Sequence, residues 1–209
     1  MITTLLVAAC AAVESPPAPA DSLVALYERG RTFAEFLAAA TRRRETWLKN
    51  AAWGQLDGEL LARVRALASS WRILVVAADW CGDSANTIPY LATFADSSGG
   101  KLHIRIVAPD DGQWVMERHR TSDGRAATPT VVVLDAEGTE VGCWVERPSA
   151  LASMMREQRA KLSQDDLLKQ KYAWLDGDRG KSTVREILDQ IEHAAPGQSC
   201  GGNARHGEQ

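Results

Sequence analysis

Apolar and polar positions along the chain predict a set of early helices followed by alternating strands and helices. Three segments are predicted to be strands: residues 73–78, 102–107 and 130–134. The first is a continuous apolar run, typical of a strand covered on both faces, whereas in the second His103 alternates with apolar Leu102 and Ile104. A fourth run, residues 141–145, follows the short turn Asp135-Ala136-Glu137-Gly138. We therefore expect the last two strands to form an antiparallel hairpin.

Helical periodicity surrounds these strands. The segment Thr32-Phe33-Ala34-Glu35 has the form of a capping box, which predicts the start of an early helix. Further helices are predicted near residues 60–67, 84–95, 110–120, 149–162, 163–177 and 183–191. Pro89 lies inside one of them and should kink it. Thr183, with Glu186 three residues later, should cap the last one.

The order of elements predicts an α/β fold with a mixed sheet and helices on both faces. A chain of 209 residues suits one enlarged domain, which we place at residues 21–194. Within it we expect an N-terminal helical extension (21–70), a core (71–162) and extra C-terminal helices (163–194). Residues 195–209 are rich in glycine and are predicted to form a flexible tail.

The N-terminal segment, residues 1–20, allows two interpretations. Residues 2–9 are apolar and end in Val7-Ala8-Ala9-Cys10, which is similar to a bacterial lipoprotein cleavage box. However, the apolar run is very short for a signal, and no Lys or Arg precedes it. We therefore expect a disordered leader and a cytoplasmic protein. A cell-envelope lipoprotein anchored through Cys10 is the alternative.

Composition limits the partners and cofactors. The formal net charge of -3 gives no electrostatic reason to expect nucleic acid, and we interpret Arg42-Arg43-Arg44 as a solvated helix face. No segment is long enough to span a bilayer as a helix. The spacing of the four cysteines and four histidines suggests no metal site, and we expect no resident cofactor.

Cys81 is the strongest candidate for chemistry. It lies in Asp79-Trp80-Cys81-Gly82-Asp83-Ser84, between the apolar run 73–78 and a predicted helix. The unpaired N–H groups and the dipole at a helix N-terminus stabilise thiolate over thiol, so this position favours a nucleophilic sulfur. The spacing is that of a redox C-x-x-C motif, but Ser84 holds its fourth position. Cys81 can therefore attack a disulfide without closing a ring to a motif neighbour.

A proline directly before a predicted strand completes the pattern. Thr128-Pro129-Thr130 precedes the apolar run 130–134, and an X–Pro bond is the kind that is cis at appreciable frequency. Together with Trp80-Cys81-Gly82, this segment resembles the thioredoxin superfamily over residues 72–162. The motif Trp-Cys-Gly-Asp-Ser is similar to that of a bacterial thioredoxin-like subfamily.

The resemblance implies roles for the candidate residues. Cys81 would be the attacking thiol and Trp80 a flat apolar wall beside it. Pro129 would be cis and would face the substrate, which would lie extended along the backbone edge at Thr128. Gly82 would also belong to the substrate-binding residues.

The next two positions depart from the family pattern. Asp83 stands where thioredoxin itself has a proline; we count it as substrate-binding, and its charge should partly oppose thiolate formation. Ser84 stands where dithiol members carry the resolving cysteine. We interpret it as a first-turn helix residue, with a hydroxyl hydrogen bond to the Cys81 thiolate as the sharper alternative.

Other interpretations of the candidates are purely structural. Trp80 could pack in the core, and Cys81 could be a small buried hydrophobe, although its position beside a glycine suggests exposure. Cys143 alternates with valines and should point into the core rather than resolve Cys81. Cys200 lies in the glycine-rich tail and is interpreted as an incidental thiol.

Two functions remain open. In the first, the protein is a monothiol thiol-disulfide oxidoreductase. Cys81 attacks a disulfide-containing protein or small disulfide, and an external thiol such as glutathione resolves the mixed disulfide. In the second, the groove between Cys81 and Pro129 binds an extended peptide without redox turnover. The fold alone cannot choose between them, and we favour the first.

Overall fold

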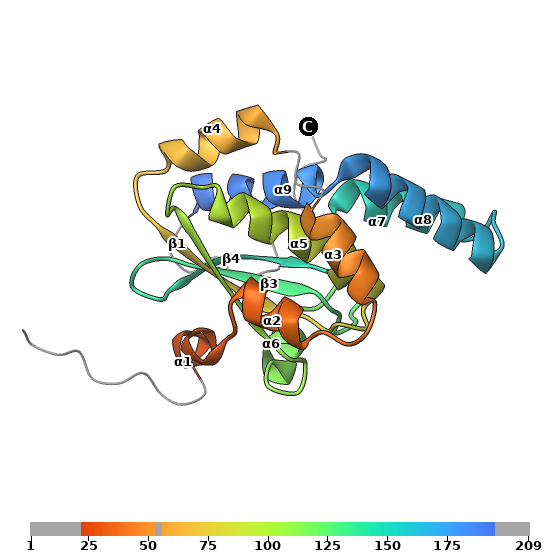
Figure 1. The fold of residues 1–209 in the computed structure, drawn as a ribbon. Helices are drawn as coiled ribbons and strands as arrows, with labels where there is room; N and C mark the ends of the chain where they lie inside the picture. The colour runs from red at the N-terminus through yellow and green to blue at the C-terminus, as the bar shows by residue number, and fades with distance from the viewer. Residues whose placement is uncertain (1–21, 53–55, 195–209) are drawn as a thin grey trace, which may run out of the picture.

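A four-stranded mixed sheet forms the centre of the computed structural model, which describes residues 22–52 and 56–194 (Figure 1). The strands are β1 (Trp71–Val76), β2 (Leu102–Val107), β3 (Thr130–Leu134) and β4 (Glu140–Val145). Their order is β2-β1-β3-β4; β1 is parallel to β2, whereas β3 is antiparallel to both β1 and β4. The predicted mixed sheet and its final hairpin are confirmed.

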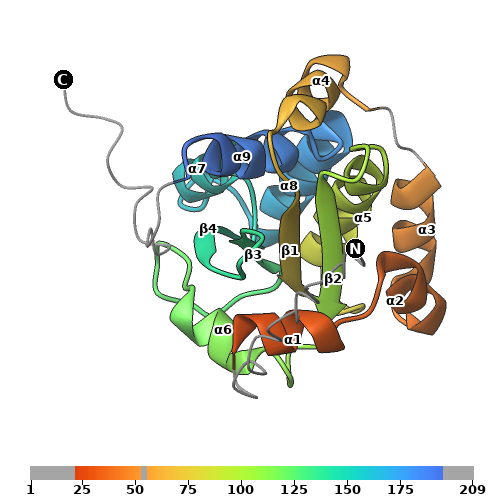
Figure 2. The ribbon, with the colours of Figure 1, turned by 90° about the vertical axis from the view of Figure 1, so that its left-hand side faces the viewer.

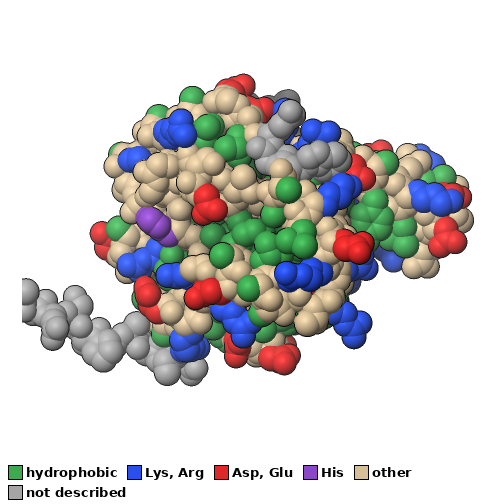
Figure 3. All heavy atoms as spheres, viewed as in Figure 1, with side chains coloured by type: hydrophobic (Ala, Val, Ile, Leu, Met, Phe, Trp, Pro, Cys, Tyr) green, Lys and Arg blue, Asp and Glu red, His purple; other side chains and the backbone are tan. Residues whose placement is uncertain are grey.

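Helices cover both faces of this sheet (Figures 1 and 2). One face carries α1 (Leu23–Arg29) and α6 (Gln113–Arg118). The other carries α2 (Phe33–Ala39), α3 (Arg44–Ala52), α4 (Gly58–Ala66), α5 (Gly82–Asp96) and α9 (Lys181–Glu192). The pair α7 (Ser149–Gln158) and α8 (Gln164–Asp178) projects from the body (Figures 1 and 3).

The side chains of β1 alternate between the two faces of the sheet and contribute to the hydrophobic core on each face. Ile73 and Val75 pack with the helices of the larger face, whereas Leu74 and Val76 pack under α1 and α6. Because successive side chains of a strand point to opposite faces, a strand covered on both sides reads as a continuous apolar run. This is why the pattern at residues 73–78 predicts a buried strand.

The helical extension also reaches the edge of the sheet. Arg31, between α1 and α2, exchanges two backbone hydrogen bonds with Ile106 of the edge strand β2, each 2.8 Å long. The capping box predicted from Thr32 and Glu35 is present at the start of α2. The extension is therefore joined to the sheet directly before its second helix begins.

Pro89 lies within α5, and the helix continues through it from Gly82 to Asp96. Proline has no N–H, so the carbonyl of Ala85, four residues earlier, loses its helical partner. The side-chain amide of Asn50 in α3 donates to that carbonyl at 2.8 Å, and the Asn50 side-chain oxygen accepts from the Tyr90 hydroxyl at 3.0 Å. A buried side chain of the extension thus completes the backbone of the helix that carries the Cys81 motif.

Some element boundaries differ from the sequence prediction. β1 begins at Trp71 rather than residue 73, because its first two residues pair with β2 while remaining half-buried, and so they do not extend the apolar run. The pattern missed α1, which follows the capping residue Ser22 and buries Leu26 and Tyr27. The helix expected over residues 110–120 is confined to α6.

The start of the last helix is also a correction. α9 begins at Lys181, two residues before the predicted cap at Thr183, which is buried within the helix. Gly180 precedes it with a φ of 75°, and a Cβ at Gly180 would lie 2.4 Å from Cβ of Tyr90, so this close junction sets the helix start. Glu186, predicted to complete the cap, accepts instead a hydrogen bond from the indole N–H of Trp144 in β4 at 2.7 Å.

Predictions for residues 1–20, residues 195–209, Cys10 and Cys200 lie outside the described residues. Within residues 22–52 and 56–194, no helix is long and apolar enough to cross a membrane.

The Asn50–Ala85 contact predicts a coupling between α3 and Pro89. Asn50→Ala leaves the Ala85 carbonyl and the Tyr90 hydroxyl without their donor and acceptor, and should lower the free energy of unfolding by about 2–4 kcal/mol in urea titrations. Pro89→Ala restores a helical N–H for that carbonyl. In the Pro89→Ala background, Asn50→Ala should cost about 1 kcal/mol less, and equal costs in both backgrounds would contradict the assignment.

Candidate functional site

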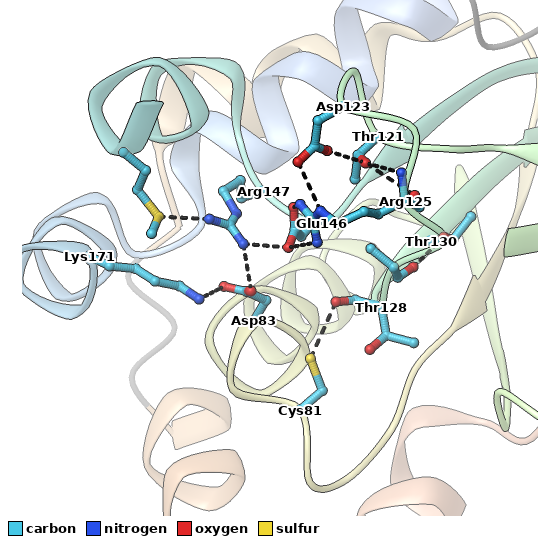
Figure 4. Close-up of polar contacts among 12 residues, drawn as sticks. Cys81, Asp83, Thr121, Asp123, Arg125, Thr128, Thr130, Glu146, Arg147 and Lys171 are labelled. Carbon is cyan, nitrogen blue, oxygen red and sulfur yellow. Dashed lines mark hydrogen bonds and ion pairs between the residues drawn. The ribbon is translucent and has the colours of Figure 1, made fainter. Parts of the chain in front are cut away.

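Cys81 caps the N-terminus of α5, as the motif predicts (Figure 4). Its sulfur accepts the Ser84 N–H at 3.4 Å and donates to the carbonyl oxygen of Thr128 at 3.3 Å. The first contact favours a thiolate, because an anion accepts a hydrogen bond more strongly. The second is available only to the protonated thiol, so ionisation of Cys81 would remove it.

Cys81 and Trp80 differ sharply in exposure. Trp80 is 57% exposed, which excludes core packing, whereas Cys81 is 9% exposed. The expectation of an exposed thiol is therefore wrong. A Cβ at the next residue, Gly82, would lie 2.6 Å from the Tyr172 hydroxyl of α8 and 3.6 Å from the guanidinium carbon of Arg43. These two side chains lie close over the start of α5, and a larger residue at position 82 would have to displace the Tyr172 hydroxyl.

Asp79 fixes the loop that precedes the thiol. Its Oδ2 atom accepts the backbone N–H groups of Thr41 and Arg42, each at 2.9 Å, and the Thr41 hydroxyl at 3.3 Å. Burial would raise the pKa of Asp79, but these hydrogen bonds outweigh it and hold the pKa below its usual value. The carboxylate therefore joins the α2–α3 turn to the Cys81 loop.

The arginine run contributes to the same junction. Arg43 Nε donates to the carbonyl of Trp80 at 2.7 Å, and the Trp47 indole donates to the carbonyl of Asp79 at 2.9 Å. Residues 42–44 are exposed, as expected, but only Arg44 lies in a helix, because α3 begins there. The two preceding arginines form the turn that holds the site.

The Thr128–Pro129 peptide bond is cis, and Pro129 itself is buried. The Pro129 carbonyl accepts the Glu146 N–H at 2.8 Å, so it is already used within the fold. The Thr128 N–H, in contrast, donates no hydrogen bond within the described part of the chain. The main-chain N–H left without an acceptor in this part of the structure therefore belongs to Thr128, whose carbonyl contacts the sulfur of Cys81.

Ser84 is fully buried, and its hydroxyl makes no hydrogen bond within the described residues. The sharper alternative, a hydroxyl hydrogen bond to the Cys81 sulfur, is thus not formed; Ser84 contacts the sulfur through its backbone N–H.

Asp83 belongs to a chain of alternating charges beside the N-terminus of α5 (Figure 4). In order of contact, the chain comprises Lys171, Asp83, Arg147, Glu146, Arg125 and Asp123. The two carboxylate oxygens of Asp83 lie 2.6 Å from Nζ of Lys171 and 3.2 Å from Arg147. Sequence reasoning missed both cations, since they are 64 residues or more away and no local pattern marks them.

Cys81 is the one free cysteine in the described residues. Cys143 is disulfide-bonded and half-buried, so the expectation that its side chain points into the core is not met. Its position on β4 places it opposite Val132, on the sheet face covered by α1 and α6. Among residues 22–52 and 56–194, no group of three or more His, Cys, Asp or Glu is placed to hold a metal ion.

Comparison with known proteins agrees with this geometry. A family model described as thioredoxin matches residues 30–163. The chain belongs to the thioredoxin-like family. The match begins within the helical extension and includes both Cys81 and Pro129, but it ends before Lys171 and Tyr172 of α8.

Two solved structures share the thioredoxin-like fold. An HIV epitope scaffold matches with a TM-score of 0.66 and 24% identity, and covers 83% of this chain and 99% of that chain. A protein of unknown function from Pseudomonas aeruginosa matches with a TM-score of 0.65 and 23% identity, over the same shares. These similarities concern the fold. The search of curated proteins gave no match.

The lowered pKa of Asp79 predicts a pH-dependent stability term. In the unfolded chain Asp79 titrates at its ordinary value of 3.8, whereas the folded protein holds it ionised to lower pH. The contribution of ionised Asp79 to the free energy of unfolding is therefore complete above pH 3.8. It is lost as the pH falls through the lower pKa of the folded state. Asp79→Asn should destabilise the protein at pH 7, and the difference from wild type should shrink at acid pH. Urea titrations from pH 7 to 2 measure this; a constant difference would contradict the assignment.

Proposed function

We propose that the protein is a monothiol thiol-disulfide oxidoreductase that acts through Cys81. The observation that carries the proposal is the position of this thiol. It lies at the N-terminus of α5, with its sulfur 3.3 Å from the carbonyl of Thr128, directly before the cis Pro129. A helix N-terminus stabilises the thiolate, which is the nucleophile in disulfide exchange.

The reaction is a thiol–disulfide exchange. Its first step replaces one disulfide with another, and the substrate is fully reduced only after an external thiol reacts. The Cys81 thiolate attacks one sulfur of a substrate disulfide, a bond forms between them, and the second substrate sulfur leaves as a thiolate that takes up a proton. An external thiolate, such as glutathione, then attacks the substrate sulfur or the Cys81 sulfur of the mixed disulfide. The second route releases reduced substrate, and another external thiol completes the two-electron reduction.

Ser84 explains why an external thiol is needed. Its hydroxyl occupies the position from which a second cysteine would displace the substrate, and oxygen forms no stable bond to sulfur in this exchange. Among the described residues, Cys81 is the only free thiol. The mixed disulfide should therefore persist until a thiol arrives from solution.

The surroundings of Cys81 support a peptide as the substrate. Trp80 presents an indole that is 57% exposed, and the Thr128 N–H donates no hydrogen bond among the described residues. An extended segment could pair with Thr128 while its side chain packs on Trp80, which would bring its disulfide to the sulfur. The same features would also serve a redox-inactive peptide-binding module, so turnover has to be measured.

Capture of a mixed disulfide tests the proposal. With oxidised glutathione, the wild-type protein should accumulate one glutathione on the Cys81 peptide, identified by mass spectrometry after alkylation and digestion. Cys81→Ser, which retains the other three cysteines, is the matched control and should give no adduct on that peptide. Absence of the Cys81 adduct in wild type would reject redox activity and favour the peptide-binding module.

Ser84→Cys should convert the protein into a dithiol enzyme. Two thiols at C-x-x-C spacing in one helical turn lie close enough to exchange with one another. The variant should resolve its own mixed disulfide and reduce insulin with dithiothreitol faster than wild type by roughly tenfold or more. Ser84→Ala controls for loss of the hydroxyl. If wild type reduces insulin as fast as Ser84→Cys, another thiol of the chain resolves Cys81.

A further inference from the structure

Lys171 is a buried lysine that forms an ion pair with Asp83. It lies on α8, within the C-terminal helices, and its side chain is 8% exposed. Its Nζ atom is 2.6 Å from Asp83 Oδ1, and Asp83 is the second residue of α5, two positions after Cys81. Removing an ammonium and a carboxylate from water is costly unless they pair, so neither charge is incidental at this place.

The neighbouring charges leave Lys171 as the cation that offsets Asp83. Arg147 also contacts Asp83, at 3.2 Å, but it contacts Glu146 as well. Glu146 in turn pairs with Arg125 at 2.9 Å. Arg147 is therefore shared between two carboxylates, whereas Lys171 faces one.

The charged and titratable groups around the thiol come from every element packed against the start of α5. Asp79 comes from the loop before α5, and Arg43 comes from the turn between α2 and α3. Lys171 and Tyr172 come from α8. Arg147 and Glu146 come from the segment after β4. Asp79 is engaged by the α2–α3 turn, and Arg43 by the Trp80 carbonyl. Asp83 is the acid within the helix turn that begins at Cys81.

We propose that Lys171 is a positioning residue that keeps Cys81 reactive, because it neutralises Asp83 and holds α8 against the start of α5. An ionised Asp83 without this partner would repel a thiolate formed two residues away. The adjacent Tyr172 lies over Gly82, so the same turn of α8 also packs against the residue between Cys81 and Asp83. The inference deepens the proposed function, on which its biological meaning rests.

The pH dependence of Cys81 alkylation by iodoacetamide tests this role, with peptide mass spectrometry to follow Cys81 alone. Lys171→Met keeps the length of the side chain and removes its charge. It should move the alkylation midpoint to higher pH by roughly half to one unit. Asp83→Asn should move the midpoint to lower pH, and the double variant should lie close to wild type, because the two charges are removed together.

Two lysine variants separate charge from structure. Lys171→Arg keeps the charge and should retain the wild-type midpoint. Lys169→Met removes a lysine from the exposed side of the same helix, where the side chain is 77% exposed and pairs with Asp166 at 3.0 Å. It should leave the profile unchanged. A Lys171→Met profile that coincides with that of Lys169→Met would overturn the proposal, as would a double variant that keeps the Lys171→Met shift.

If Lys171→Met does not fold by circular dichroism, the comparison moves to the Asp83→Asn background, in which no unpaired carboxylate remains. There, addition of Lys171→Met should raise the midpoint relative to Asp83→Asn alone, and coincident profiles would overturn the inference. Alkylation does not require disulfide exchange. Loss of the midpoint shift with an intact glutathione adduct would therefore reject the role of Lys171, and the reverse result would reject the oxidoreductase.

Discussion

The Asp79 carboxylate is the contact on which the arrangement of the site depends. It accepts two backbone N–H groups and one hydroxyl from the turn between α2 and α3, and it directly precedes Trp80 and Cys81. Without this acceptor, the turn would have unpaired amides and the loop would have no fixed distance from the extension. The junction also brings Arg43 to the Trp80 carbonyl, directly before the thiol.

The site is consequently built from segments far apart in the sequence. The extension holds the loop from one side through Asp79, and α8 holds the first turn of α5 from the other through Lys171. The cis-proline loop is held by Glu146, whose N–H bonds the Pro129 carbonyl and whose carboxylate pairs with Arg125. A thioredoxin-like core alone would lack the first two of these supports.

Much of the fold could be predicted from the sequence, because its signals are local. Continuous apolar runs mark β1 and β3, and the capping box at Thr32 marks α2, since each depends on residues a few positions apart. Cys81 and Thr128-Pro129 were also identifiable, because their residue types and family pattern are distinctive. The start of α9 could not be predicted in this way, because it depends on close contact between Gly180 and Tyr90, which are far apart in the sequence.

The electrostatics of the site could not be predicted in this way. The charge of Asp83 was expected to act on the sulfur, yet its partners Lys171 and Arg147 come from distant segments. The same holds for Asn50, whose contact with the Ala85 carbonyl compensates for a proline in another helix. Sequence spacing shows which residue types are present, whereas pairing across the fold decides which charges remain uncompensated.

The two hydrogen bonds between Arg31 and Ile106 give the extension a protective role as well. β2 is an outermost strand of the sheet, and an unpaired strand edge is a template for association with other chains. Arg31 occupies both main-chain groups of Ile106 and places two helices beside that edge. A fragment that begins at β1 and lacks α1–α4 would expose this edge and gain a route to edge-to-edge aggregation. The extension therefore covers a strand edge and also holds the loop that precedes the thiol.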